Sequence, residues 1–340
     1  MKLMRTEDAV GQVLCHDITQ IIRGVTKDAV FRKGHIIREE DIPVLLSVGK
    51  DNIYVWENDE TMMHENEAAE VLCAICKGEN ISRGVVKEGK IELSAECDGI
   101  FRINREKLLA VNSFGQMMIA TRHGDFPVKK GDKLAGTRII PLVIEKEKME
   151  KVRALCGEEP ILRVEPYKPR KVGIVTTGNE VFYGRIKDTF TPVVIEKVEY
   201  FGAEVIGHKT TDDANEHIEA CIRELLDAGC DMILCTGGMS VDPDDKTPLA
   251  IRNVAGSVVT YGAPVLPGAM FLLAYYGEKQ IPIMGLPGCV MYSKRTIFDL
   301  VLPRIMAGEI LTKEDFDILG EGGLCLNCKV CVFPDCGFGK

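Results

Sequence analysis

The sequence lacks any apolar run of the ~18–20 residues that cross a bilayer as a helix. Its first residues, MKLMRTEDAVGQ, lack the apolar core of a signal peptide. Positive charge is also in deficit, since 42 Lys and Arg against 51 Asp and Glu give a net charge of −9. These absences predict a cytoplasmic protein with neither a membrane nor a nucleic acid as partner. A phosphorylated small molecule stays open, because helix N-termini bind phosphate without net positive charge.

Catalytic signatures based on Ser-His-Asp order or on H-E-x-x-H spacing are absent as well. What the sequence does have is 340 residues, of which 46% are hydrophobic and 27% charged, a composition typical of globular proteins with two or three domains. It also has 13 cysteines. Because cytoplasmic thiols stay reduced, these cysteines are expected to be metal ligands or small core residues and not a disulfide framework.

Changes in pattern divide the chain into four segments. Residues 1–60 read as a small β-rich unit with one short helix in IREEDIPVLLSVG. Residues 61–168 read as an α+β region that ends in a proline-containing connector. Residues 169–308 read as an α/β domain, and residues 320–340 as a Cys-rich tail. A C-x-x-C pair, Cys73 and Cys76, lies in a helical pattern and is expected in the core.

The α/β pattern begins at KVGIVTTG, a buried strand that runs into a glycine turn. The helix DTFTPVVIEKVEYFG, the strand AEVIGHKTT, the helix DDANEHIEACIRELLDAG and the strand CDMILCTGG follow. Two more strands, FLLAYY and IPIMGL, precede a closing helix expected over residues 290–308. Strands and helices that alternate at this spacing predict a three-layer α/β/α domain with a mostly parallel sheet. The fold class is therefore α/β, preceded by a β-rich α+β region.

Three loops with similar composition follow three of these strands: TTGNE, TGGMS and GLPG. In an open parallel sheet, ligands bind where strands end at their carboxyl side. Glycines let the backbone approach a ligand and turn N–H groups toward an anion, and hydroxyls add neutral donors. The alternative is that these glycines only make tight turns. The candidate binding residues are Thr177, Gly178, Glu180, Thr236, Gly237, Gly238, Met239, Ser240, Gly285, Pro287 and Gly288.

The order TTGNEV, a helix opening at Asp188, TGGMSVDPDD and GLPG resembles the molybdopterin-binding domain of molybdopterin adenylyltransferases and molybdopterin molybdenumtransferases. The opening segment, with MRTEDAVGQVLCHDIT and FRKGHIIREEDIP, is similar to the start of the molybdenumtransferase. By this resemblance, the loop from Thr236 to Ser240 holds the terminal phosphate of the pterin. Asp188 and Asp245 are the implied catalytic residues, with Mg²⁺ between carboxylates and phosphate oxygens. Each aspartate has an alternative role as a helix cap.

The resemblance implies molybdopterin, or its adenylylated form, and molybdate as ligands, and an enzyme that inserts molybdate. A homo-oligomer and a recipient molybdoenzyme are further implied partners. The sequence departs from the molybdenumtransferase pattern at three places: it has no Asp-Gly-Tyr-Ala element, Asn179 stands in the first loop for the usual aspartate, and Cys289-Val290 follow GLPG. Two alternatives therefore stay open, a pterin-binding carrier or sensor with a metal-binding tail and a hydrolase of nucleotide pyrophosphates.

The tail GLCLNCKVCVFPDCGFGK places Cys325, Cys328, Cys331 and Cys336 at x₂, x₂ and x₄ spacing. Two-residue gaps let neighbouring thiolates converge on one metal centre. The run is similar to that of an iron–sulfur cluster, and zinc in a Cys₄ site is the rival. The remaining alternative is a thiol-rich tail that holds no metal.

Overall fold

The computed structural model describes residues 1–57, 59–240, 242–243 and 245–340. The chain forms two compact units. The N-terminal unit comprises residues 1–96, 103–122 and 130–163, and the C-terminal unit comprises residues 97–102, 123–129 and 164–340. Within the described stretches of chain, no helix combines the length and the apolar character that a bilayer crossing requires.

The N-terminal unit is rich in short strands. These strands are β1 (Lys2–Arg5), β2 (Ile18–Ile22), β3 (Thr26–Phe31), β4 (Asn52–Val55), β5 (Met62–His64), β6 (Ile81–Arg83), β7 (Lys90–Ala95), β9 (Met117–Thr121), β11 (Lys133–Ile139) and β12 (Val143–Glu145). Its helices are η1 (Thr6–Asp8), η2 (Glu39–Asp41), α1 (Ile42–Ser47), α2 (Glu65–Cys76), α3 (Arg105–Ser113) and α4 (Lys146–Cys156). At the start of the chain, the strand pairs β1–β4 and β2–β3 accompany a core cluster that includes Leu14, Ile18 and Leu45.

The rest of this unit is an antiparallel sheet of order β6-β7-β11-β9, against which α2 packs. Side chains cap two of the helices: the His64 ring accepts the N–H of Asn66 at the start of α2, and Asn104 accepts that of Lys107 at the start of α3. Cys73 and Cys76 are buried, which confirms their assignment to the core.

The C-terminal unit contains the strands β8 (Gly99–Ile103), β10 (Phe126–Val128), β13 (Leu162–Pro166), β14 (Lys171–Thr177), β15 (Glu204–Thr211), β16 (Met232–Thr236), β17 (Val258–Tyr261), β18 (Leu272–Tyr276) and β19 (Ile281–Leu286), of which β8 and β13 each extend by one or two residues into the other unit. Its helices are α5 (Asn179–Phe182), α6 (Thr191–Glu199), α7 (Asn215–Asp227), α8 (Thr247–Ala255), η3 (Gly288–Met291), α9 (Ile297–Met306), α10 (Lys313–Asp317) and η4 (Ile318–Gly320).

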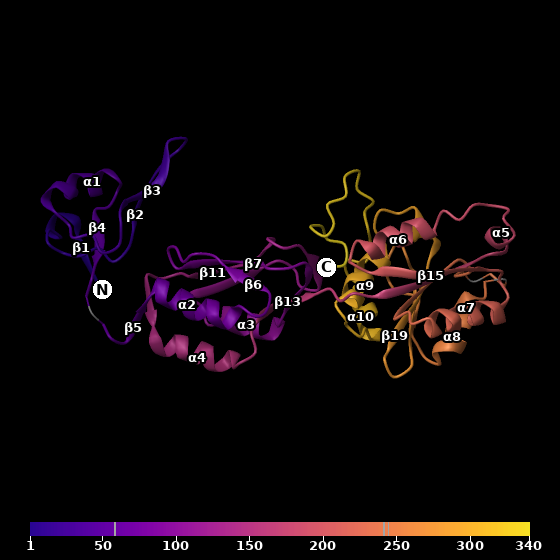
Figure 1. The fold of residues 1–340 in the computed structure, drawn as a ribbon. Coiled ribbons are helices and arrows are strands. Elements are labelled where there is room, and N and C mark those ends of the chain that lie inside the picture. Colours follow the sequence, from indigo (N-terminus) through magenta and orange to yellow (C-terminus); the bar gives the residue numbers. More distant parts are fainter. Residues whose placement is uncertain (58, 241, 244) are drawn as a thin grey trace. The chain divides into compact units, whose positions relative to one another are not determined.

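A six-stranded sheet of order β15-β14-β16-β19-β18-β17 forms the centre of the C-terminal unit. The strands β15, β14, β16 and β19 are parallel, and β18 and β17 continue the sheet antiparallel. Alternate residues of β14 enter two separate cores, since Ile174 packs with α6 and α9 whereas Val175 packs with α7 and α8. Figure 1 shows these two helix pairs on opposite faces of the sheet. The predicted α/β fold with a mostly parallel sheet is confirmed.

Several details of the sequence-based prediction were wrong. The helix expected to open at Asp188 begins at Thr191, and the short α5 was not expected. The closing helix expected over residues 290–308 begins only at Ile297, because Thr296 and Asp299 form a capping box there. The segment before it forms the short η3. The strand β17 was not expected, and it pairs at the sheet edge with β18.

The Cys-rich tail packs on the core of the C-terminal unit. Phe338 is 4% exposed and belongs to that core, and Phe333 packs against it. A β-bridge joins Leu266 to Leu324. The tail therefore uses an apolar core that the preceding domain already provides.

Buried arginines join distant segments of the C-terminal unit. The Arg102 guanidinium in β8 contacts Glu165 at 2.7 Å, Asp125 at 2.7 Å and Glu309 at 2.5 Å. Glu309 also accepts from Arg304 in α9 at 2.6 Å. Three carboxylates around a guanidinium that is largely buried hold β8, β13 and the end of α9 together.

We expect Arg102→Ala to lower the free energy of unfolding of the C-terminal unit by about 3–5 kcal/mol, because it removes the positive charge from a buried ionic cluster. Lys209→Ala is the matched control, since Lys209 forms an exposed pair with Glu224 and exposed ion pairs contribute little to stability. Urea unfolding followed by circular dichroism measures both. Equal losses in the two variants would show that the Arg102 cluster is not a main support of the unit.

Candidate functional site

The three glycine-containing loops leave one edge of the C-terminal sheet. In the parallel ladder, Thr176 of β14 pairs with Thr236 of β16, and Thr236 pairs with Leu286 of β19. The strands therefore end at the same level, and the loops after them start side by side. This register agrees with the expectation of one shared edge for the three loops.

Buried threonine hydroxyls form a layer beneath the loops. The hydroxyl of Thr176 lies 2.8 Å from that of Thr191 and 3.4 Å from that of Thr236. The hydroxyl of Thr177 lies 3.0 Å from that of Thr247, the first residue of α8. Hydroxyls can donate and accept at once, so this layer satisfies buried polar atoms and fixes the loops on the strand ends.

Glycine is required at two positions of the second loop. Gly237 has φ +86°, and a Cβ there would lie 2.2 Å from the carbonyl oxygen of Thr177. Gly238 has φ +55°, and its Cβ would lie 2.8 Å from the hydroxyl of Thr247. The first and second loops thus approach each other so closely that only glycine fits between them.

The other predicted binding residues occupy different environments. Gly178, with φ +134°, precedes α5, which carries Glu180. The side chain of Met239 is buried in the core, where its Sδ is 2.5 Å from the position of a Cβ on Gly285. Ser240 is exposed. Of the third loop, Gly285 and Pro287 are buried, whereas Gly288 is exposed and a Cβ on it would have no neighbour within 4 Å.

Asp188 is held in place by four donors. Its Oδ1 accepts the N–H groups of Phe190 at 2.9 Å and Thr191 at 3.0 Å. Its Oδ2 accepts the hydroxyls of Thr191 at 2.5 Å and Thr176 at 3.3 Å, and His208 lies 3.8 Å away. Burial by itself would raise the pKa of Asp188, but these hydrogen bonds and His208 lower it below its usual value. The carboxylate therefore links the start of α6 to β14.

Asp245 closes the second loop, because its Oδ2 accepts the N–H of Ser240 at 2.8 Å. A carboxylate that the sequence did not single out, Asp213, accepts the N–H of Asn179 at 2.9 Å. Burial raises the pKa of Asp213, and the negative charges of Glu180 and Asp245 raise it further. Three acidic side chains from three loops therefore act on one another electrostatically at this edge of the sheet.

Asp213 and the partners of Asp188 are what sequence reasoning missed. In DDANEHIEAC the two aspartates stand at the start of the predicted helix, and nothing in the sequence distinguishes them. In the structure Asp212 has that role, since it accepts the N–H of Ala214 and contacts His217. Asp213 instead turns toward the first loop. The available signal was its place directly after β15, the fourth parallel strand that ends at this edge.

The predicted metal ligands do not gather into a site among the residues that the structure describes. No group of three or more His, Cys, Asp or Glu side chains in those residues is placed to hold a metal ion. Of the tail cysteines, Cys328 and Cys331 are exposed, whereas Cys325 and Cys336 are partly buried. The tail arrangement therefore does not fit a Cys₄ centre, and the acidic side chains at the loops do not form a Mg²⁺ site by themselves.

Comparison with known sequences gives two family matches. Residues 173–307 match a family described as a probable molybdopterin binding domain. Residues 3–57 match a domain of unknown function, DUF8806.

Among curated proteins, the chain is similar to the molybdopterin molybdenumtransferase of Synechococcus elongatus, with 25% identity over 250 residues, which are 70% of this chain. The match covers 57% of that relative, so the chain spans little more than half of its length. A CinA-like protein of Desulfosudis oleivorans is 38% identical over 82 residues, which are 24% of this chain and 20% of that protein.

Among solved structures, the molybdopterin biosynthesis enzyme MoaB of Thermus thermophilus is 24% identical, with a TM-score of 0.35, and the match covers 41% of this chain and 98% of that one. The matched residues 173–307 include β15, β16, β19, all but the first two residues of β14, and all three loops. Residues 173–307 of this chain are therefore similar to the family of probable molybdopterin binding domains, and this match covers less than half of the chain.

Proposed function

We propose that the C-terminal unit binds molybdopterin, or its adenylylated form, at the loops after β14, β16 and β19, and that the protein takes part in molybdenum cofactor biosynthesis. The family match of residues 173–307 supports this proposal. The observation that carries it is the forced glycine pair Gly237-Gly238 at the end of β16. Gly237 and Gly238 both have positive φ, and glycine turns of this kind can present successive backbone N–H groups to an anion.

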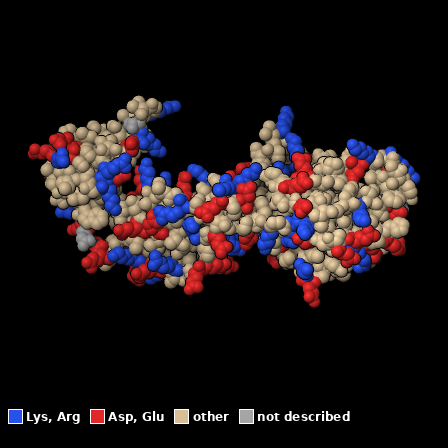
Figure 2. Space-filling view, in the orientation of Figure 1, with Lys and Arg blue, Asp and Glu red and all other residues tan. Residues whose placement is uncertain are grey.

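The charges around the loops support a definite orientation of the ligand. Glu180 and Asp213 repel a phosphate, so the phosphate belongs at the glycine pair of the second loop and away from these two carboxylates. In the same loop Asp245 already accepts the N–H of Ser240. The carboxylates match hydrogen-bond donors, which pterin rings carry. The face drawn in Figure 2 has Lys and Arg interspersed with Asp and Glu, in keeping with the net charge of −9. This distribution favours a small ligand over nucleic acid.

We further propose that the protein is an enzyme that inserts molybdate. The similarity to a molybdopterin molybdenumtransferase supports this step, although it covers 57% of that relative. In this role the carboxylate that acts on the ligand is that of Asp245, which accepts the N–H of Ser240 in the second loop. Asp188 positions α6 and the end of β14.

Mg²⁺ in this reaction would neutralise phosphate charge. The described carboxylates do not gather into a site for it, so no step of the proposal depends on the ion. The same holds for zinc or an iron–sulfur cluster in the tail. Metal analysis of protein purified without oxygen tests the tail directly, and a stoichiometric metal that is lost in Cys328→Ser would restore the Cys₄ prediction.

Nucleotide-pyrophosphate hydrolysis is the second candidate function. Glycine loops that bind the phosphate of a pterin can equally bind a pyrophosphate, which supports this candidate. A hydrolase would release a nucleoside monophosphate from a dinucleotide in the absence of any pterin. A carrier or sensor, the third alternative, would bind the pterin without turnover.

Gly288→Val is expected to weaken pterin binding by at least about 10-fold, because it adds a side chain at the exposed loop without an internal clash. Calorimetric titration with molybdopterin under anaerobic conditions measures the affinity. Gly238→Val also blocks the loop, but its Cβ meets Thr247, so that variant changes stability as well. Gly136→Val in β11 is the matched control, since a Cβ there also has no neighbour within 4 Å. Unchanged affinity in Gly288→Val would refute the third loop as part of the site.

Replacement of each of the two aspartates by asparagine distinguishes a role in stability from a role in turnover. Asp188→Asn should destabilise the unit by about 1–2 kcal/mol, because the carboxylate accepts four hydrogen bonds. Asp245→Asn should impair molybdate-dependent turnover with a smaller loss of stability. Equal losses of turnover and stability in Asp245→Asn would make Asp245 a structural residue.

The acid dependence of stability tests Asp188 separately. Its pKa is lower in the folded protein, so the stability that it contributes is present above its unfolded pKa and is lost as the pH falls through the folded value. The difference in urea midpoint between the natural protein and Asp188→Asn should stay constant from about pH 8 to about pH 5 and shrink below about pH 4. A constant difference at all pH values would show that the charge of Asp188 is not what stabilises α6.

A further inference from the structure

The Cys-rich tail presents two thiols to solvent. All 13 cysteines lie in the part of the chain that the structure describes, and of these only Cys328 and Cys331 are exposed. Cys325 and Cys336, the other two cysteines of the tail, pack against the core of the C-terminal unit. Figure 1 shows the tail, in yellow, as a loop that projects from this unit. The tail cysteines therefore divide into an anchored pair and an accessible C-x-x-C pair.

Two basic residues just before α9 hold the accessible pair in place. The Lys294 ammonium donates to the carbonyl oxygen of Cys328 at 3.2 Å. The Arg295 guanidinium is bound by the buried carboxylate of Asp299 at 2.9 Å, and it lies 4.9 Å from the centroid of the Phe333 ring. The C-x-x-C turn therefore lies between two cations whose positions the domain itself determines.

These cations act on the sulfur of Cys331. This sulfur accepts the backbone N–H of Phe333 and a guanidinium N–H of Arg295, and the positive charge of Lys294 adds to their effect. Together these contacts lower the pKa of the Cys331 thiol below its usual value. A sulfur that is open to solvent and whose negative charge is stabilised in this way is suited to attack a disulfide.

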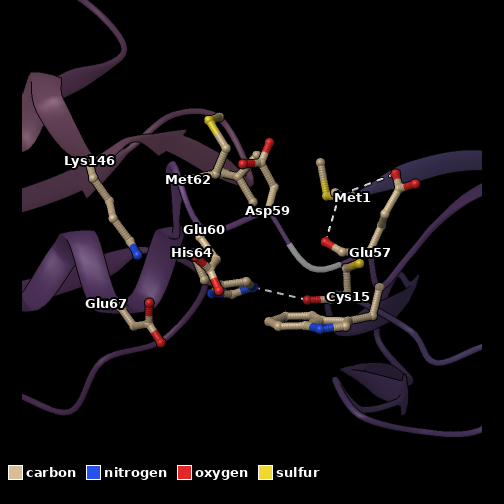
Figure 3. A pocket seen from close by; sticks show the side chains of 11 residues that line it. Met1, Cys15, Glu57, Asp59, Glu60, Met62, His64, Glu67 and Lys146 are labelled. Atoms are coloured by element: carbon tan, nitrogen blue, oxygen red, sulfur yellow. Dashed lines mark hydrogen bonds and ion pairs between the residues drawn. The ribbon is translucent and has the colours of Figure 1, made fainter.

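Most other thiols of the chain are in the opposite state. Burial raises the pKa of eight of them, namely Cys15, Cys73, Cys76, Cys156, Cys221, Cys230, Cys235 and Cys289. Cys15 is the most useful comparison, because it lines a cavity of about 280 Å³ in the N-terminal unit (Figure 3). A small molecule in that cavity would meet a side chain that is only 2% exposed. Cys15 therefore serves as an internal control for thiol reactivity.

We propose that Cys328 and Cys331 form a redox-active dithiol that exchanges with low-molecular-weight disulfides. The Cys331 thiolate attacks one sulfur of a disulfide RSSR, which forms a mixed disulfide and releases RS⁻. Cys328 then loses its proton and attacks the Cys331 sulfur, which forms the Cys328–Cys331 disulfide and releases the second RS⁻. The dithiol is oxidised by two electrons, RSSR is reduced to two thiols, and the two protons of the dithiol end on these products.

The C-x-x-C spacing agrees with this role, since disulfide oxidoreductases use two cysteines at the same spacing. The reaction uses none of the residues in the loops after β14, β16 and β19. The proposal is therefore independent of the proposed function, and its failure would leave pterin binding untouched.

The uncharged probe 2-hydroxyethyl disulfide tests the exchange, because its reaction rate reports on the sulfur and not on attraction between charges. The reduced natural protein should release two equivalents of 2-mercaptoethanol, and mass spectrometry after digestion should locate a Cys328–Cys331 disulfide. Cys331→Ser should slow the reaction at least about 10-fold. Cys328→Ser should stop at the mixed disulfide on Cys331. Cys15→Ser is the matched control and should react like the natural protein.

A second pair of variants tests the contact with Arg295. Arg295→Gln should slow the first step about 3- to 10-fold, because the thiolate loses a hydrogen-bond donor and a positive charge. Lys197→Gln is the matched control, since Lys197 also binds Asp299, at 2.6 Å, but is not among the groups that act on Cys331. Circular dichroism verifies that both variants fold.

Four results would overturn the proposal. They are an unchanged rate in Cys331→Ser, equal slowing in Arg295→Gln and Lys197→Gln, a disulfide that joins other cysteines, and a stoichiometric metal held by Cys328 and Cys331 in protein purified without oxygen. The last result would make these two thiols metal ligands and not a free dithiol.

Discussion

The close approach of two loops at the end of β14 and β16 constrains the whole candidate site. A Cβ at Gly237 would lie 2.2 Å from the carbonyl oxygen of Thr177, so the loops can meet only if glycine stands there. Their meeting depends in turn on parallel strands that end in register and on hydroxyl contacts such as that between Thr177 and Thr247. A larger residue at this point would separate the loops, and with them the backbone donors and carboxylates that they carry.

The same packing explains which parts of the fold were predictable. Short continuous apolar runs identify β14 and β16, and an amphipathic pattern identifies α7, because each pattern is local to its element. The strand β17 was not predicted, because its formation depends on pairing with β18 at the sheet edge. The start of α9 also depends on a local detail, the capping box of Thr296 and Asp299, which the prediction of a helix from residue 290 overlooked.

The candidate site was predictable as a set of loops but not as a set of contacts. Glycines and hydroxyls mark the loops in the sequence, whereas the direction of each side chain depends on residues far away. Met239 stands in the middle of a binding motif, yet its side chain fills the core against Gly285. In the tail, the cysteine spacing indicates a metal centre, whereas the structure shows Phe333 and Phe338 packed on the core of the preceding domain. That packing could not be predicted from the tail sequence, because the core is formed by residues far away in the chain.

The acidic character of the site constrains what it can bind. Glu180 and Asp245 raise the pKa of Asp213 because negative charges close to one another disfavour ionisation. A ligand that places hydrogen-bond donors or positive charge beside these carboxylates relieves this repulsion, whereas one that places a phosphate there increases it. Phosphate is instead favoured at the glycine loop, where backbone N–H groups supply the attraction. An elongated ligand with a phosphate at one end and donors at the other therefore fits this edge of the sheet better than a compact polyanion does.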